Sequence, residues 1–265
     1  MLVLGYIGAL IMGLVLGLIG GGGSILTVPI LVYLFGVGKV TATAYSLFIV
    51  GATAAAGSAS HVRQGNIHWR SAIWFGAPSI AAVFATRAWL LPAIPDELSI
   101  GGSIVPKGTL LLLLFAVLMV AAAVGMVRGG TGPRAPSTHK HSTAMILACT
   151  EGIAVGTLTG LVGAGGGFLI IPALVMLGGL GMKQAIGTSL VIIAAKSLIG
   201  FTGDLLAGLH ADWAFLLACT ATAIAGILLG AALSTRIPGE RLKPAFGWFV
   251  LVTGMAMVVA ELVRA

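Results

Sequence analysis

A glycine-rich run inside apolar sequence occurs twice in this chain, once in each half. The first copy reads GLIGGGGS over residues 17–24, and the second reads GLVGAGGG over residues 160–167. Each glycine weakens a helix by about 1 kcal/mol relative to alanine, so these runs predict helix breaks. In a bilayer, irregular backbone is tolerated only where it is buried in protein or lines a cavity. We interpret the two runs as the two halves of one binding site.

The composition predicts an integral membrane protein. Hydrophobic residues make up 58% of the chain and charged residues only 8%, against about 25% charged in soluble proteins. The net charge of +7 comes without a basic run or interleaved aromatics, so we expect no nucleic-acid partner. The first residues lack a basic region, so we expect no cleaved signal peptide. Cys149 and Cys219 lie in apolar segments and predict buried thiols without a redox or metal role.

Hydropathy predicts an all-α chain of ten apolar segments. Most are long enough to cross hydrocarbon, which takes about 20 residues. The second and seventh, which follow the glycine runs, are shorter and predict either tilted half-helices or re-entrant hairpins. The segments are residues 2–19, 24–36, 41–60, 71–92, 108–128, 143–163, 167–179, 185–207, 213–235 and 244–262.

The two halves of the chain repeat each other. A shift of 143 residues aligns six pairs without a gap, and one residue inserted later aligns Trp69 with Trp213. The chain therefore divides into repeats at 1–128 and 143–265, joined by a linker at 129–142. Because each repeat has five segments, the second is expected to be inverted in the membrane. The aligned pairs are Gly17 with Gly160, Pro29 with Pro172, Gly36 with Gly179, Ser46 with Ser189, Gly57 with Gly200, and Gly65 with Gly208.

Loop charges predict the orientation. Cations concentrate on one side of this topology, which is cytoplasmic by the positive-inside rule and includes the linker. The other side holds both termini and is expected to lie outside the plasma membrane, the inner membrane of a bacterium. The predicted cytoplasmic cations are Arg63, Arg70, Arg128, Arg134, Lys140, Lys183, Arg236, Arg241 and Lys243. The outer side receives Asp96, Glu97, Asp204 and Asp212, with Lys39, Arg87, Lys107 and Arg264.

Backbone amides at the two breaks predict an anion site. A helix that starts after a glycine run directs unpaired N–H groups and the positive end of its dipole towards the break, which favours an oxyanion. The alternative is that the glycines only allow close helix packing. The candidate residues are Gly20, Gly21, Gly22, Gly23 and Ser24 in the first copy, and Gly163, Gly165, Gly166 and Gly167 in the second.

Lys196 lies near the middle of the eighth segment, where a cation is costly and usually functional. It is predicted either to attract the anion or to form a structural pair with Glu151 or Asp204. Glu151 could instead carry a proton. The hydroxyl residues Tyr45, Ser46, Thr188 and Ser189 are further candidates for substrate contact, or they satisfy backbone carbonyls within their helices. His139 and His141, in the linker, are expected to be solvated, and no metal or cofactor is predicted.

Four phrases of the sequence resemble the TauE/SafE family of sulfite exporters and related anion permeases: GLIGGGGSILTVPIL, HVRQGNIHWR, GTLTGLVGAGGGFLIIPAL and AIGTSLVI. The resemblance covers nearly the whole chain and implies a secondary transporter of small sulfur-containing or carboxylate anions. The chain departs from the family pattern at Lys196, where a small polar residue such as asparagine is common.

The sequence therefore predicts export of a small sulfur-containing oxyanion by alternating access, with a sulfite-like, sulfonate or thiosulfate substrate. The alternatives are a passive anion channel, or a permease that imports a small organic acid. An enzyme is not predicted, because no HExxH or GxSxG motif is present and all histidines lie in loops or at segment edges. The partners expected are the anion and the lipid bilayer, and the sequence does not indicate an oligomeric state.

Overall fold

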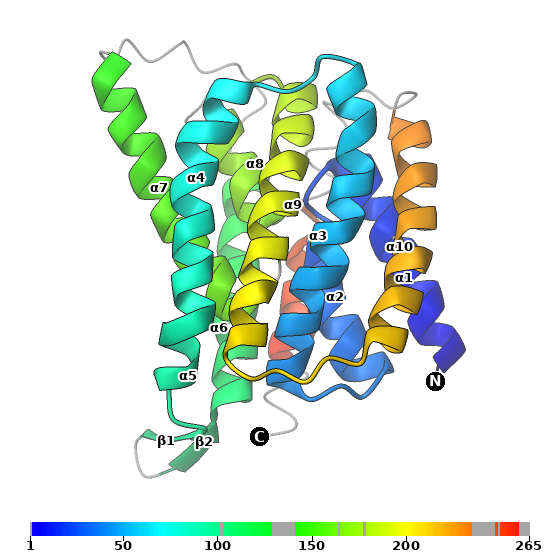
Figure 1. The fold of residues 1–265 in the computed structure, drawn as a ribbon, viewed down its shortest axis with the longest axis vertical. Helices are drawn as coiled ribbons and strands as arrows, with labels where there is room; N and C mark the ends of the chain where they lie inside the picture. Colours follow the sequence, from blue (N-terminus) through cyan, green and yellow to red (C-terminus); the bar gives the residue numbers. More distant parts are fainter. Residues whose placement is uncertain are drawn as a thin grey trace.

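The protein is a bundle of helices with one small β-hairpin at its lower end (Figure 1). The computed structural model describes residues 2–100, 103–128, 141–163, 165–176, 179–234, 247–248 and 250–259. Helices lie within each of the ten apolar segments, because long apolar stretches satisfy their backbone hydrogen bonds internally. Most of the predicted linker, residues 129–140, is outside the described residues, and the helix after it already begins at His141.

The elements of the first half are α1 (Leu2–Ile19), α2 (Ser24–Pro29), the π-helical turn η1 (Ile30–Leu34), α3 (Lys39–Arg63), α4 (Trp69–Ala85), the π-helical turn η2 (Thr86–Leu90), α5 (Leu91–Ala93), β1 (Glu97–Ile100), β2 (Ser103–Pro106) and α6 (Lys107–Arg128). Those of the second half are α7 (His141–Val162), α8 (Gly167–Met176), α9 (Met182–Leu206) and α10 (Trp213–Ser234), and residues 250–259 are helical.

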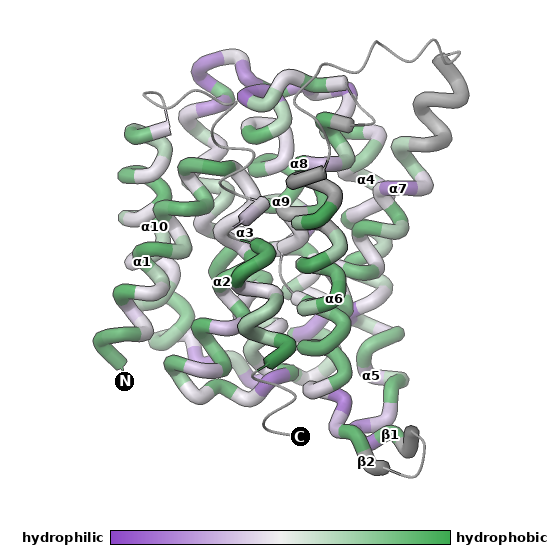
Figure 2. The backbone as a smooth tube through the Cα atoms, turned by 180° about the vertical axis from the view of Figure 1, so that it is seen from behind, coloured by the Kyte–Doolittle hydropathy of each residue, from purple (hydrophilic) through white to green (hydrophobic). Residues whose placement is uncertain are grey.

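Five helical stretches of the described chain are long and apolar enough to cross a membrane. They are α1, α3, the continuous helix Trp69–Ala93, α9 and α10. Hydrophobic residues follow the helices, and hydrophilic residues gather in the connections at the upper and lower ends (Figure 2). This distribution is that of a multi-pass membrane protein.

Helices α3 and α9 form the centre of the bundle. In each, 67% of the most apolar stretch is buried inside the protein, compared with 33–39% in the other three long helices. The two run in opposite directions, α3 from the lower to the upper end and α9 back down (Figure 1). Helices α1, Trp69–Ala93 and α10 therefore have more of their surface exposed.

The chain reverses direction at the first glycine run. The start of α1 packs against the end of η1, where Phe35 stacks edge-on against Tyr6 and its ring lies against Gly5. Gly8, one turn further along α1, contacts Leu34 and Ile30. The two short elements α2 and η1 thus return towards the end of the bundle from which α1 started.

Small residues allow two pairs of helices to approach closely, and the two pairs correspond under the repeat. In α1, Gly13 meets the backbone of Ala223 in α10, and in α7 the equivalent Gly156 meets the backbone of Ser79 in α4. A Cβ on either glycine would collide with the facing carbonyl, so glycine is required for this packing. The first helix of each half therefore packs on the fourth apolar segment of the other half.

The hairpin of β1 and β2 is an element that hydropathy did not predict. The strands pair antiparallel, with Glu97 opposite Pro106 and Leu98 opposite Val105. Lys107 links the two ends of the hairpin. The Nζ of Lys107 lies 2.9 Å from Oδ1 of Asp96 and also donates to the carbonyl of Ile94 at 3.1 Å. The described part of the connection between the fourth and fifth segments thus contains paired strands beyond the bundle.

Candidate functional site

The two glycine runs meet in the interior of the bundle. Gly21 and Gly167 are so close that a Cβ added to either would overlap the backbone of the other, and both are buried. The runs are 146 positions apart when counted between these two glycines. Their approach brings the start of α8 against the break that precedes α2, which places the two predicted half-sites side by side.

The two breaks share one backbone feature and differ in another. Gly20 and its repeat partner Gly163 both adopt left-handed conformations, with φ of 77° and 75°. The second break has two further left-handed residues, Gly165 and Gly166, with φ of 62° and 71°. Only glycine adopts this conformation readily, so side chains are excluded from these positions. The second break, the glycine turn formed by Gly163, Gly165 and Gly166, is therefore the more irregular of the two.

Several backbone donors in the breaks are unpaired. Among the described residues, no backbone acceptor is present for the N–H groups of Gly21, Gly22 and Gly23, or for those of Gly165 and Gly166. After the first break Ser24 uses its hydroxyl locally, donating to the carbonyl of Gly21 at 2.6 Å. Buried backbone donors are rarely left without a partner. These amides are available to a ligand.

Lys196 of α9 directs its ammonium group at the second break. The side chain is fully buried, and a Cβ built on Gly166 would lie 2.7 Å from Nζ. Nζ donates to Oγ1 of Thr159 in α7 at 2.9 Å. An ammonium group has three N–H donors, and no second acceptor for Nζ is found in the described part of the chain. Lys196 thus supplies a positive charge with spare donors next to the glycine turn.

The first break has no such charge. Under the repeat, Thr159 corresponds to Leu16, and Lys196 corresponds to Thr53. Gly23 packs against the backbone of Met12 and Leu16, whereas Gly166 packs against the side chains of Thr159 and Lys196. Thr53 donates to the carbonyl of Ile49 in its own helix at 2.6 Å. The polar groups of the site are therefore concentrated at the second break.

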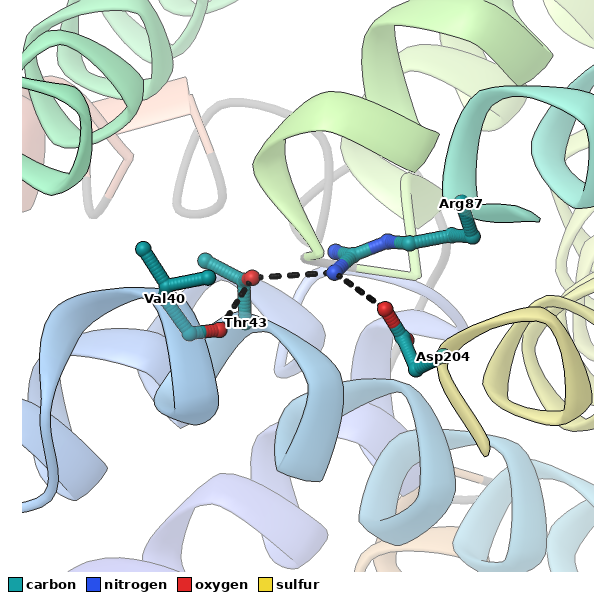
Figure 3. Close-up of polar contacts among 4 residues, drawn as sticks. All are labelled: Val40, Thr43, Arg87 and Asp204. Carbon is teal, nitrogen blue, oxygen red and sulfur yellow. Dashed lines mark hydrogen bonds and ion pairs between the residues drawn. The ribbon is translucent and has the colours of Figure 1, made fainter. Parts of the chain in front are cut away.

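Arg87 is a buried cation that the sequence interpretation counted with the charges of the outer side. The structure places it in η2, fully buried, with its side chain directed into the bundle (Figure 3). Its Nη1 donates to Oγ1 of Thr43 at 3.0 Å and to Oδ1 of Asp204 at 3.2 Å. Arg87 and Asp204 are thus buried within the bundle, although the sequence interpretation counted both among the loop charges of the outer side. The signal that could have found Arg87 was an arginine inside an apolar segment.

The predicted partners of Lys196 lie elsewhere. Asp204 pairs with Arg87, and Glu151 is partly exposed on α7. No carboxylate of the described residues lies within 4.0 Å of Nζ of Lys196, and no cluster of three metal-ligating side chains is found among them. The lysine is therefore held by a neutral hydroxyl, which leaves its charge uncompensated.

Three of the four candidate hydroxyl residues have protein partners. Tyr45 accepts from the backbone N–H of Asp212 at 2.8 Å, and Thr188 accepts from that of His68 at 2.9 Å. Ser189 donates to the carbonyl of Ile186. The hydroxyl of Ser46 is buried and has no partner among the described residues. Ser46 is thus the member of this group with a free polar atom.

The apolar helices, with charged side chains buried among them, define a multi-pass membrane protein. The model of the family described as "Sulfite exporter TauE/SafE" matches residues 5–257. The chain belongs to this family, and the resemblance of the glycine phrases is confirmed.

Two similar proteins are both named as membrane transporters. A "Probable membrane transporter protein" of Xylella fastidiosa (strain 9a5c) is 34% identical, over 94% of this chain and 91% of that protein. The "Probable membrane transporter protein YdhB" of Bacillus subtilis (strain 168) is 26% identical, over 94% of this chain and 96% of that protein. No solved structure matches the chain significantly. These names support a membrane transporter and specify no substrate.

Proposed function

We propose that the protein is a secondary transporter that exports a small sulfur-containing oxyanion, of the sulfite, sulfonate or thiosulfate kind, across the bacterial inner membrane by alternating access. The observation that carries this proposal is the fully buried ammonium group of Lys196 against the glycine turn at Gly166. A cation at this depth costs a few kcal/mol and ordinarily faces a partner or a pathway.

The anion binds at the second break. The start of α8 supplies the positive end of a helix dipole, and the turn supplies the unpaired N–H groups of Gly165 and Gly166. Lys196 supplies the charge. The first break forms one wall of the site, because the backbone of Gly21 contacts that of Gly167. Ser46, with its free hydroxyl, is a further candidate contact.

The repeats at 1–128 and 143–265 form two inverted halves, with 129–142 as the cytoplasmic linker and both termini outside. The opposed directions of α3 and α9 support this arrangement, as does the exchange of contacts between α1–α10 and α7–α4. The reversal of the chain after α1 supports re-entrant hairpins at the breaks. Rocking of one hairpin against the central helices would expose the site alternately to each side.

Export follows from the membrane potential. An anion leaving a cell that is negative inside moves downhill by roughly 2.3 kcal/mol per charge per 100 mV. The transporter therefore needs no coupling cation, and the charge of Lys196 disfavours one near the site. A permease that imports a small organic acid would use the same donors against this potential. The backbone contact of Gly21 with Gly167 in the interior favours a transporter over an open channel.

Flux in reconstituted vesicles tests the proposal. With an outward sulfite gradient, efflux should saturate with concentration, accelerate with an inside-negative voltage, and fall strongly in Lys196→Met. Lys183→Met, an exposed lysine on the same helix, is the matched control. Efflux that ignores voltage and follows an imposed proton gradient would overturn the uncoupled mechanism. Efflux without saturation would identify a channel.

A further inference from the structure

The guanidinium group of Arg87 is anchored at one corner only. Its Nη1 makes both hydrogen bonds, to Thr43 and to Asp204. Thr43 in turn donates to the carbonyl of Val40 at 2.7 Å, which orients the hydroxyl to accept from the arginine (Figure 3). Two residues of the central helices thus hold the guanidinium in one orientation.

The opposite edge of the same group has no partner. Both Nε and Nη2 of Arg87 are buried and unpaired among the described residues. These two nitrogens form the side-on edge of a guanidinium, whose parallel N–H donors match two oxygens bonded to one atom. Buried side-chain donors in proteins nearly always have a partner. A rigid edge with two buried and unpaired donors indicates a ligand.

This unpaired edge lies at the second break. A Cβ built on Gly163 would lie 2.5 Å from Nη2 of Arg87, so the guanidinium lies directly against the first residue of the turn. Lys196 lies against Gly166 at the other end of the same turn. The two buried cations therefore flank one short glycine turn, in which the N–H groups of Gly165 and Gly166 have no backbone acceptor among the described residues.

We propose that the Nε–Nη2 edge of Arg87 binds two oxygens of the transported anion at this turn. The inference rests on the proposed function and assigns Arg87 as a residue that binds its substrate. The anion carries at least two oxygens on one central atom, as sulfite, sulfonates and carboxylates do, and a halide fits poorly. Asp204 and Thr43 act as positioning residues, because they direct the edge and leave it free.

The first test compares two probe anions on the purified protein. Methanesulfonate offers paired oxygens, and chloride offers the same charge without them. Binding is measured by calorimetry and thermal shift. The wild-type protein should bind methanesulfonate at least about tenfold more tightly than chloride, since charged hydrogen bonds are involved. Equal affinities would overturn the role of Arg87 but not anion transport. Failure to bind any anion would instead overturn the proposed function.

Variants then assign the preference to Arg87. Arg87→Lys keeps the positive charge and removes the two parallel N–H donors. The affinity for methanesulfonate should therefore fall at least about tenfold, while the affinity for chloride should change less than about threefold. Arg63→Lys, the same change at an exposed arginine, is the control and should alter neither. Parallel losses for both probes, or no loss for either, would show that Arg87 acts only as a structural cation.

A second variant covers the case in which Arg87→Lys does not fold. Arg87→Met combined with Asp204→Leu removes the buried pair without changing the net charge, a replacement that proteins often tolerate. This protein should fold and lose its preference for methanesulfonate. A folded double variant that keeps the preference would contradict the proposal, and the wild-type comparison stands whether or not either variant folds.

Discussion

The backbone N–H of His68 donates a hydrogen bond of 2.9 Å to the hydroxyl of Thr188, 120 positions away in the other half of the chain. The same bond occurs a second time with the halves exchanged, because the N–H of Asp212 donates to the hydroxyl of Tyr45 at 2.8 Å. Thr188 and Tyr45 are repeat partners, as are His68 and Asp212. Each bond ties the loop after one central helix to the first turns of the other.

Removing either hydroxyl should weaken the fold by a similar amount. Thr188→Val and Tyr45→Phe each leave a partly buried N–H without an acceptor, which costs about 1–3 kcal/mol. Thermal unfolding in detergent measures the loss. Thr202→Val is the control, because its exposed hydroxyl bonds only to its own helix. A large loss in one variant and none in the other would contradict the equivalence of the two bonds.

Labelling should place the two ends of the helix Trp69–Ala93 on opposite sides of the membrane. Gln64 precedes this helix and Glu97 follows it. In a background with Cys149→Ala and Cys219→Ala, Glu97→Cys should react with an impermeant maleimide from outside, and Gln64→Cys only after permeabilisation. The reverse pattern would invert the proposed orientation.

The contact between the two breaks should tolerate no side chain. Gly167→Ala places a methyl group into the backbone of Gly21, so we expect loss of transport and a lower melting temperature. Gly181→Ala is the control, since nothing lies within 4 Å of its Cβ position and the change should stay within about 0.5 kcal/mol. Normal transport by Gly167→Ala would show that the breaks separate during function.

Lys196 should act on the anion and not through Glu151. Lys196→Met should weaken methanesulfonate binding by about tenfold or more, because a charged donor is lost. Adding Glu151→Gln should restore neither binding nor stability, since no carboxylate among the described residues pairs with the lysine. Calorimetry on both variants decides this. Recovery of binding or stability on adding Glu151→Gln would instead support a structural pair between Lys196 and Glu151.

Much of the fold could be predicted because its signals are local. Apolar length identified the ten segments, and glycine content located both breaks between helices. The β-hairpin at Glu97–Pro106 was missed, since hydropathy treats a connection between spans as a loop. The duplication also indicated that the two breaks belong together, and the structure brings Gly21 and Gly167 into contact.

The partners of the buried cations could not be predicted in the same way. Asp204 was a reasonable partner for Lys196, two turns away on one helix, yet it pairs with Arg87, 117 positions away. Lys196 instead meets Thr159 on α7. Which side chains meet depends on how neighbouring helices are rotated and how far they are displaced along their axes. A single sequence contains no direct record of either quantity.

The charges around the second glycine turn have a kinetic consequence. Arg87 and Lys196 contribute two positive charges to a buried region where Asp204 contributes one negative charge. Without an anion, one charge stays unneutralised where the dielectric is low, and the empty protein must rearrange around it. When an anion is bound, its negative charge neutralises that positive charge while the protein rearranges. One-for-one exchange of anions should therefore outpace net efflux, and substrate added on the far side should speed the exit of a radiolabelled one.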